Sequence, residues 1–134
     1  MERRQRILIV DDDVDTLANL SDILSDQGFD TVTAADGDRA LAVVNQTCEG
    51  QSAPIDLCLL DFKMPRKDGA QVVGEIRQQL PDLPTIMITA YAGDDGAQRA
   101  HQAGTYRVMR KPVDIPTLLS TIEKALSPEL AGEH

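Results

Sequence analysis

The sequence predicts an α/β domain built on a parallel β-sheet that helices cover on both faces. Its 134 residues fit one domain. Short apolar runs rich in β-branched residues alternate along the chain with longer segments whose apolar residues recur at helical spacing. The short runs are apolar almost throughout, which is typical of strands buried on both faces of a parallel sheet.

The first half of the chain predicts two strands and two helices. Residues 7–10 (Ile-Leu-Ile-Val) form a buried strand, and apolar residues at positions 17, 20, 23 and 24 predict a helix over residues 14–27. Gly28 follows where helices commonly end. Residues 31–34 predict a second, weaker strand. Asp36-Gly37 then turns the chain into a helix with apolar residues at positions 40, 41, 43 and 44, and residues 47–54 predict a loop.

The second half predicts three strands and three helices. Ile55 to Leu60 form the third strand, and a helix from Gly69 to Leu80 ends before Pro81. Thr85 to Ile88 form the fourth strand, which an Ala-rich helix over residues 94–103 follows. The fifth strand covers residues 106–110. The last helix runs over residues 113–126 with its apolar residues on one stripe.

Composition excludes several classes of protein. The net charge of −9 disfavours direct binding to nucleic acid, because the phosphate backbone would be repelled. No apolar stretch approaches the roughly 20 residues that a membrane span needs, and no signal peptide opens the chain, so we expect a cytoplasmic protein. Cys48 and Cys58 predict neither a disulfide framework nor a metal site, and Cys58 reads as a small core residue.

Polar residues gather where the predicted strands end. Ligands of an open parallel sheet bind beyond the carboxyl ends of its strands. At those ends stand Asp11, Asp12 and Asp13 after the first strand, Asp61 after the third, Thr89 after the fourth and Lys111-Pro112 after the fifth.

Each of these residues has a simpler explanation when it is taken alone. Asp13 is a natural helix N-cap, Thr89 a β-branched strand residue, Lys111-Pro112 the start of a helix and Asp68-Gly69 a turn. Their arrival at one edge is harder to explain, because gathered carboxylates repel one another unless a cation offsets them. Mg²⁺ is the natural cation, and a Lys and a Thr nearby could bind phosphoryl oxygens. The pattern predicts in-line attack by a carboxylate on a phosphoryl donor.

These residues resemble the response-regulator receiver family over nearly the whole chain. The matching pieces are Ile-Leu-Ile-Val-Asp-Asp-Asp at 7–13, Leu-Leu-Asp-Phe-Lys-Met-Pro at 59–65, Asp-Gly at 68–69, Ile-Met-Ile-Thr-Ala-Tyr at 86–91, Ala-Gly at 103–104 and Lys-Pro at 111–112. The resemblance implies a flavodoxin-like (βα)5 doubly wound sheet with strand order 2-1-3-4-5. It implies a receiver over residues 1–126, with residues 127–134 a polar tail or the start of a linker.

The resemblance also implies roles for individual residues. Asp61 resembles the phosphoacceptor, Asp12 a direct Mg²⁺ ligand and Asp11 an acid that holds the metal through water. The third protein ligand would be the main-chain carbonyl of Lys63. Thr89 and Lys111 resemble the hydroxyl and the ammonium that contact the phosphoryl group, and the Lys111-Pro112 peptide bond is expected to be cis.

Function follows from these roles. The resemblance implies a phosphorelay switch that receives its phosphoryl group from a sensor histidine kinase or a phosphotransfer protein. Such a domain catalyses only its own phosphotransfer and dephosphorylation. Phosphorylation would shift the face made by the fourth helix, fifth strand and fifth helix, which could meet a second copy or an output partner. Its exposed residues would be Arg99, His101, Gln102, Tyr106, Arg107 and Arg110.

The chain departs from the family pattern at three places. Val108 stands where the family often has a Tyr or Phe that swings inward on activation, and Tyr106 on the same strand face need not replace it. The loop over residues 47–54 is longer than usual. Lys63 and Tyr91 hold positions that overhang the phosphoryl group, which predicts a comparatively long-lived phosphoaspartate.

Two rival functions remain. Asp13-Val14-Asp15 faintly imitates the nucleophile motif of haloacid-dehalogenase phosphatases, but the chain has no room for a cap domain and this reading leaves Asp61 unexplained. A flavodoxin-like nucleotide or FMN carrier would need a phosphate-binding loop and aromatic residues, and aromatics are only 3 % of this chain.

Overall fold

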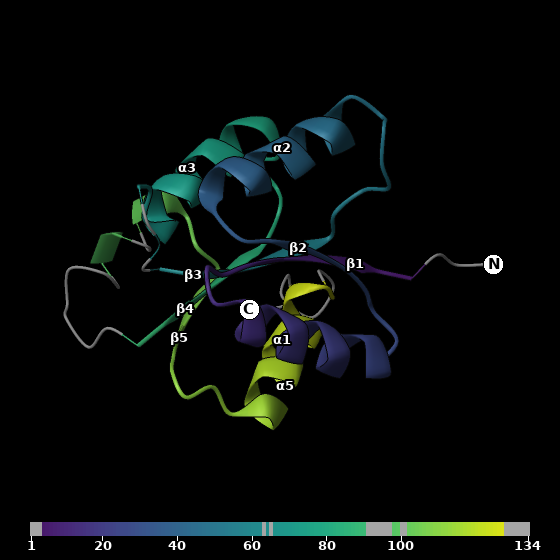
Figure 1. Ribbon diagram of the computed structural model, residues 1–134, viewed down its shortest axis with the longest axis vertical. Coiled ribbons are helices and arrows are strands. Elements are labelled where there is room, and N and C mark those ends of the chain that lie inside the picture. Colours follow the sequence, from purple (N-terminus) through teal and green to yellow (C-terminus); the bar gives the residue numbers. More distant parts are fainter. Residues whose placement is uncertain (1–3, 63, 65, 91–97, 100–101, 128–134) are drawn as a thin grey trace.

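The computed structural model describes residues 4–62, 64, 66–90, 98–99 and 102–127, and these form a three-layer α/β structure (Figure 1). Five parallel strands form one sheet in the order β2-β1-β3-β4-β5. The strands are β1 (Arg6–Val10), β2 (Asp30–Ala34), β3 (Leu57–Asp61), β4 (Thr85–Thr89) and β5 (Arg107–Arg110). The helices are α1 (Val14–Asp26), α2 (Gly37–Cys48), α3 (Gly69–Gln79) and α5 (Ile115–Ala125). The flavodoxin-like fold and its strand order are therefore confirmed.

Helices cover both faces of the sheet, so the strands divide their side chains between two cores. In Figure 1, α2 and α3 lie on one face, and α1 and α5 lie on the other. Successive strand residues point to opposite faces. Leu8 and Leu60 pack towards α2 and α3, whereas Ile9 and Leu59 pack towards α1 and α5. All four side chains are buried, as the uninterrupted apolar runs of the sequence predicted.

Every one of these four helices begins at an aspartate. The side chains of Asp13, Asp36, Asp68 and Asp114 each accept a hydrogen bond from a backbone N–H of the first turn. Such caps satisfy N–H groups that have no partner inside the helix, and a negative charge there also suits the helix dipole. Part of the acidic surplus is thus structural, and the N-cap role predicted for Asp13 is confirmed.

Several predicted boundaries were wrong. The loop predicted over residues 47–54 starts later, because α2 continues to Cys48, and β3 begins at Leu57 rather than Ile55. The last helix begins at Ile115 behind its Asp114 cap, not at Val113, so Lys111-Pro112 is not the start of that helix. The Lys111-Pro112 peptide bond is cis, as expected. Of the helix predicted over residues 94–103, residues 98–99 and 102–103 are helical, and the others lie outside the described residues.

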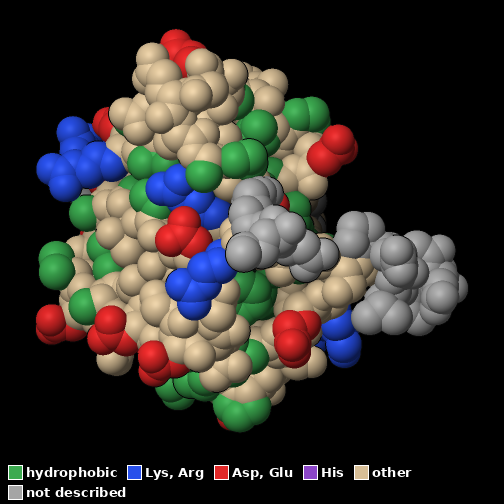
Figure 2. Space-filling view, turned by 90° about the vertical axis from the view of Figure 1, so that its right-hand side faces the viewer, with side chains coloured by type: hydrophobic (Ala, Val, Ile, Leu, Met, Phe, Trp, Pro, Cys, Tyr) green, Lys and Arg blue, Asp and Glu red, His purple; other side chains and the backbone are tan. Residues whose placement is uncertain are grey.

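The two outer strands are more exposed than the central three. Strand β5 ends the sheet, and Arg107 and Arg110 at its two ends are exposed. Val108 and Met109 between them are partly buried and pack into opposite cores. Figure 2 shows the face of the molecule at the amino ends of the strands, where acidic and basic side chains are mixed. Among the described residues, no helix is long and apolar enough to span a membrane.

Candidate functional site

Three carboxylates converge at the carboxyl end of the sheet. Asp11 directly follows β1, Asp12 comes next, and Asp61 is the last residue of β3. Strands β1 and β3 are neighbours, with Val10 paired to Leu60, so the residues after them are brought side by side. One carboxylate oxygen from each of the three acids lies within 4.8 Å of the others. The convergence predicted from the sequence is therefore present.

The three acids differ in their surroundings. Asp11 and Asp61 are 4 % and 8 % exposed, whereas Asp12 lies at the surface. Asp11 is held in place on both sides: its backbone N–H donates to the Ala34 carbonyl at 3.2 Å, and its Oδ1 accepts from the Asp13 N–H at 2.9 Å. The site therefore has a fixed buried acid and a solvent-facing one.

Lys111 brings the positive charge of the site. Its Nζ lies 3.4 Å from Asp11 Oδ2 and 3.5 Å from Asp61 Oδ2. Partial burial acts to lower the pKa of Lys111, but the charges of Asp61 and Asp11 outweigh it and the pKa is raised above its usual value. Lys111 therefore remains an ammonium between the two buried acids at neutral pH.

Thr89 completes the group of predicted residues. It is the last residue of β4 and is 5 % exposed. Its carbonyl accepts a hydrogen bond of 2.8 Å from the Lys111 backbone N–H, which fixes the start of the cis peptide segment relative to β4. Asp61 pairs with Ile88 in the β3–β4 register, so Thr89 lies one residue beyond the acid on the neighbouring strand.

Gly69 brings helix α3 close to the end of β3. The Gly69 N–H donates to the Phe62 carbonyl at 2.6 Å, which closes the loop between β3 and α3. A Cβ at this position would lie 2.6 Å from Met87 Sδ and 2.8 Å from both the Asp61 carbonyl oxygen and Phe62 Cα. Only glycine fits here. The sequence predicted Asp68-Gly69 as a turn, but glycine is required at position 69 because of this close packing.

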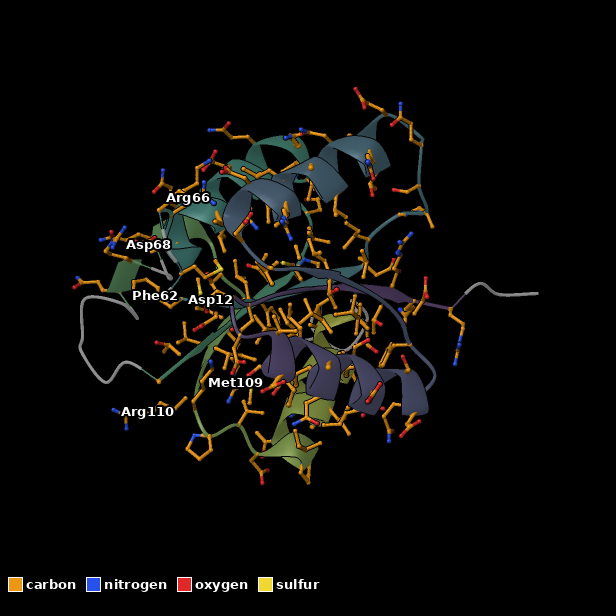
Figure 3. All side chains as sticks on the ribbon, viewed as in Figure 1. Asp12, Phe62, Arg66, Asp68, Met109 and Arg110 are labelled. Carbon is orange, nitrogen blue, oxygen red and sulfur yellow. The ribbon has the colours of Figure 1, made fainter. Side chains whose placement is uncertain are left out.

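Arg99 is exposed, as predicted, and its guanidinium also contacts the same loop. Its Nη2 lies 2.6 Å from Asp68 Oδ2, and its guanidinium carbon lies 5.8 Å from the centre of the Phe62 ring. Figure 3 shows Phe62, Asp68 and Asp12 at one end of the sheet. The sequence carried no signal for this contact, since 31 positions separate Arg99 from Asp68.

The remaining predicted residues fall into three groups. Gln102, Tyr106, Arg107 and Arg110 are exposed, as expected for a surface, and Val108 is partly buried against the core on the α2–α3 side. The carboxylate of Asp13 caps the first turn of α1. It accepts hydrogen bonds from the Thr16 hydroxyl and the Asp15 N–H, and these bonds lower the pKa of Asp13. Lys63, Tyr91 and His101 lie outside the described residues.

The donor set fits a hard divalent cation. Among the residues that the structure describes here, three carboxylates lie beside the ammonium of Lys111, and a divalent cation would offset their mutual repulsion. Carboxylate oxygens are the ligands that such cations take, and the acidic cluster can hold a metal ion. A cavity of about 630 Å³ opens beside the acids; apolar residues of α1, β1 and β3 form much of its wall. Asp11, Asp61 and Lys111 also line this cavity.

Comparison with known proteins decides which family this arrangement represents. The sequence profile of the response regulator receiver domain matches residues 7–123. The chain belongs to the response regulator receiver domain family. It is thus a receiver domain of a two-component system, which is not an enzyme of the classical kind, and its acids Asp11, Asp12 and Asp61 form a cluster consistent with a phosphoaccepting aspartate site.

Relatives and solved structures agree with this assignment. A response regulator receiver protein from Anaeromyxobacter sp. is 37 % identical over 86 % of this chain. A CheY-like receiver domain from Methanospirillum hungatei is 30 % identical, covers 98 % of this chain and all of that one, and has a TM-score of 0.85. CheY in a CheX–CheY–BeF3–Mg²⁺ complex from Borrelia burgdorferi is 29 % identical, with a TM-score of 0.79 over 90 % of this receiver and 87 % of that chain.

The match is to part of the relatives only. This receiver spans 46 % of the length of the Anaeromyxobacter protein and 26 % of several other curated relatives. The solved Methanospirillum chain, by contrast, is covered in full.

Proposed function

We propose that Asp61 accepts a phosphoryl group from a sensor histidine kinase or a phosphotransfer protein, and that the modification switches the domain between two states. The observation that carries this proposal is the meeting of Asp61 with Asp11, Asp12 and Lys111: the acids lie within 4.8 Å, and Lys111 Nζ is 3.5 Å from Asp61 Oδ2. Carboxylates brought this close repel one another unless a cation offsets them, and such clusters of ionisable groups are typical of functional sites.

The reaction is a substitution at phosphorus. An Asp61 carboxylate oxygen forms a bond to phosphorus while the bond from phosphorus to the donor atom breaks, and the donor leaves with the bonding electrons. Lys111, already at 3.5 Å, supplies an N–H donor and positive charge to the transferred oxygens, and the hydroxyl of Thr89 is a second donor within the same edge of the sheet.

We propose Mg²⁺ as the metal that the cluster holds. Asp12, Asp61 and the main-chain carbonyl of Lys63 would be direct ligands, and the buried Asp11 would act through water. When bound, Mg²⁺ supplies positive charge that offsets the charge of the acids and of the phosphoryl oxygens. A related receiver was solved with Mg²⁺ and BeF3, which supports this choice.

The signal would leave through the face that contains the segment between β4 and β5, strand β5 and helix α5. Phosphorylation adds negative charge next to Lys111 and Thr89. Thr89 directly precedes the segment between β4 and β5, and Lys111 directly follows β5. Its exposed residues would meet a second copy of the chain or an output partner. Because Val108 replaces the aromatic residue, Thr89 would act without a ring swing.

We further propose that residues 1–126 are the receiver unit and residues 127–134 a tail or the start of a linker. The family match to residues 7–123 lies within the proposed receiver unit and supports it. A cytoplasmic location is also proposed, since both cysteines are free thiols, which is usual in reducing compartments.

The test is incubation with acetyl phosphate and Mg²⁺, followed by intact-mass measurement and peptide mapping. We expect one phosphoryl group on the wild type, located on Asp61, and none on Asp61→Asn. Acetate leaves as the phosphoryl group is transferred, so no other product is needed. The proposal fails if the wild type gains no phosphoryl group, or if Asp61→Asn gains one at the same rate.

A further inference from the structure

The cavity beside the acids extends far from them, between two helices. Helices α1 and α5 cover the same face of the sheet (Figure 1), and residues of both line this cavity of about 630 Å³. Apolar side chains form its floor on the strands and its walls on the helices and the segment before α5: Ile9, Leu59, Leu20, Ile23, Val113 and Ile115. This volume and this lining are typical of sites for small organic molecules. We call it the α1–α5 cavity.

The charged groups of the α1–α5 cavity stand at its mouth, where the strands end. Of the described residues that line the cavity, Asp11, Asp13 and Asp61 carry carboxylates, and Lys111 carries the ammonium. This ammonium already has two partners, since Lys111 Nζ lies 3.4 Å from Asp11 Oδ2 and 3.5 Å from Asp61 Oδ2. An anionic ligand would therefore meet three carboxylates and an ammonium that is already engaged.

Asp13 contributes an exposed negative charge to this mouth. Its carboxylate accepts hydrogen bonds from the Asp15 N–H and the Thr16 hydroxyl, and these neutral donors leave its charge in place. Helix α1, which forms one wall, contains three aspartates and no Lys or Arg. The mouth therefore complements a positively charged group on a ligand.

We propose that the α1–α5 cavity binds a small apolar molecule that carries an amine. The apolar part of the ligand lies between the two helices, where it is removed from water, and its ammonium lies at the mouth beside the carboxylates. There the ammonium offsets charge that a divalent cation would also offset, so the ligand and Mg²⁺ compete. Amine binding itself needs neither Mg²⁺ nor phosphoryl transfer, because it uses only the side chains of the unmodified chain.

An NMR titration of the whole chain, without Mg²⁺ or a phosphodonor and at neutral pH, tests the proposal. The three probes share one apolar group and differ in charge: 4-phenylbutylamine, 4-phenylbutan-1-ol and 4-phenylbutanoate. We expect a dissociation constant on the order of 1 mM for the amine. The carboxylate should bind roughly tenfold more weakly, with the alcohol between the two. Amide shifts should change most at residues that line the cavity, such as Ile9, Leu59 and Ile115.

Filling the cavity from α1 tests the location of the ligand. Ile23 is partly buried and Asn19 is exposed, and both line the cavity. Ile23→Phe and Asn19→Phe should each weaken amine binding roughly fivefold or more, because the added ring takes space that the ligand needs. Ala18 provides the matched control, since it is exposed on the same helix and is not among the described residues that line the cavity. Ala18→Phe should change the dissociation constant less than about twofold.

Asp13→Asn tests the role of charge at the mouth. Asparagine caps a helix about as well as aspartate, so α1 keeps its N-cap while the mouth loses one negative charge. The amine should then bind about two- to threefold more weakly and the carboxylate correspondingly more tightly. Added salt should weaken binding of the amine and leave that of the alcohol unchanged.

Urea unfolding shows whether each variant is folded, and if Ile23→Phe is not, Asn19→Phe decides. The proposal is overturned if the amine binds no more tightly than the alcohol or the carboxylate. It is also overturned if the folded Phe variants that fill the cavity bind the amine as tightly as Ala18→Phe. Failure of the proposed function is a separate result, because a chain that accepts no phosphoryl group on Asp61 would still bind the amine.

Discussion

Helix α3 contains two glycines that should respond to alanine in opposite ways. Gly69 is the first residue of the helix, and a Cβ there would meet Met87 Sδ at 2.6 Å and two backbone atoms, the Asp61 oxygen and Phe62 Cα, at 2.8 Å. Gly74 lies in the helix interior, and a Cβ there would meet nothing within 4 Å. One helix therefore supplies both the test and its control.

The expected free energies follow from these distances. Ordinary contacts of a Cβ are 3.4–4 Å, so a methyl group at Gly69 must displace the backbone at the end of β3 by several tenths of an ångström or more. Overpacking of this kind costs about 1–3 kcal/mol, and alanine recovers at most about 0.5–1 kcal/mol of helix preference. We expect Gly69→Ala to lower the free energy of unfolding by about 1–2 kcal/mol and Gly74→Ala to raise it by about 0.5–1 kcal/mol.

Urea unfolding monitored by circular dichroism measures both changes, without Mg²⁺ and at one pH. The two variants should differ by about 2 kcal/mol, which corresponds to a separation of roughly 6–10 °C in melting temperature for a domain of this size. Because the displaced atoms belong to Asp61 and Phe62, Gly69→Ala should also accept phosphoryl groups from acetyl phosphate more slowly, whereas Gly74→Ala should match the wild type.

The reasoning would be refuted if Gly69→Ala were as stable as Gly74→Ala. That result would mean that α3 can move away from β3 at no cost, and the close approach could not be what positions the end of the strand. An equal loss of stability in both variants would contradict it as well, because Gly74 has room for a methyl group.

Three further predictions concern charge, thiols and the overhanging side chains. The pKa of Lys111 is raised from 10.5 in the folded state, so its contribution to stability is complete below that pH and is lost as the pH rises through the folded value. Urea unfolding across that range should show the difference in free energy of unfolding between wild type and Lys111→Met shrinking at high pH. A difference that stays constant would contradict this. Burial raises the pKa of Cys58 to about 12, whereas Cys48 is exposed. A thiol reagent at about pH 8 should therefore label Cys48 alone in the folded protein and both cysteines after denaturation. Labelling of both cysteines in the folded protein would count against this prediction. Lys63→Ala and Tyr91→Ala should each shorten the lifetime of the phosphoaspartate, measured by mass after removal of acetyl phosphate, and unchanged decay in both would dismiss the idea.

The sequence predicted the fold and the acidic cluster because both follow from short-range patterns. Uninterrupted apolar runs such as residues 7–10 identify buried parallel strands, and the ends of such strands must meet at one edge. The positions of Asp11 and Asp61 follow from that rule alone. The start of α5 did not, because Pro112 and Pro116 both suit a first helical turn, and the cap at Asp114 decided between them.

Contacts between distant segments could not be read in the same way. The ion pair of Arg99 with Asp68 depends on how the chain after β4 packs beside α3, and no local pattern encodes that distance. Gly69 was visible as a turn residue, yet its real constraint is the sulfur of Met87 on another strand. In both cases the sequence singled out the residue but did not predict which distant residue it contacts.

Strand β5 has a further consequence for the behaviour of the molecule in concentrated solution. The sheet ends at this strand, and an outer strand offers unpaired backbone groups to which a strand of another molecule can add. The exposed Arg107 and Arg110 place positive charges at both ends of β5, so the β5 strands of two molecules repel as they approach. The arginines thereby act as gatekeepers against aggregation, and replacing them with valine would favour intermolecular β-pairing.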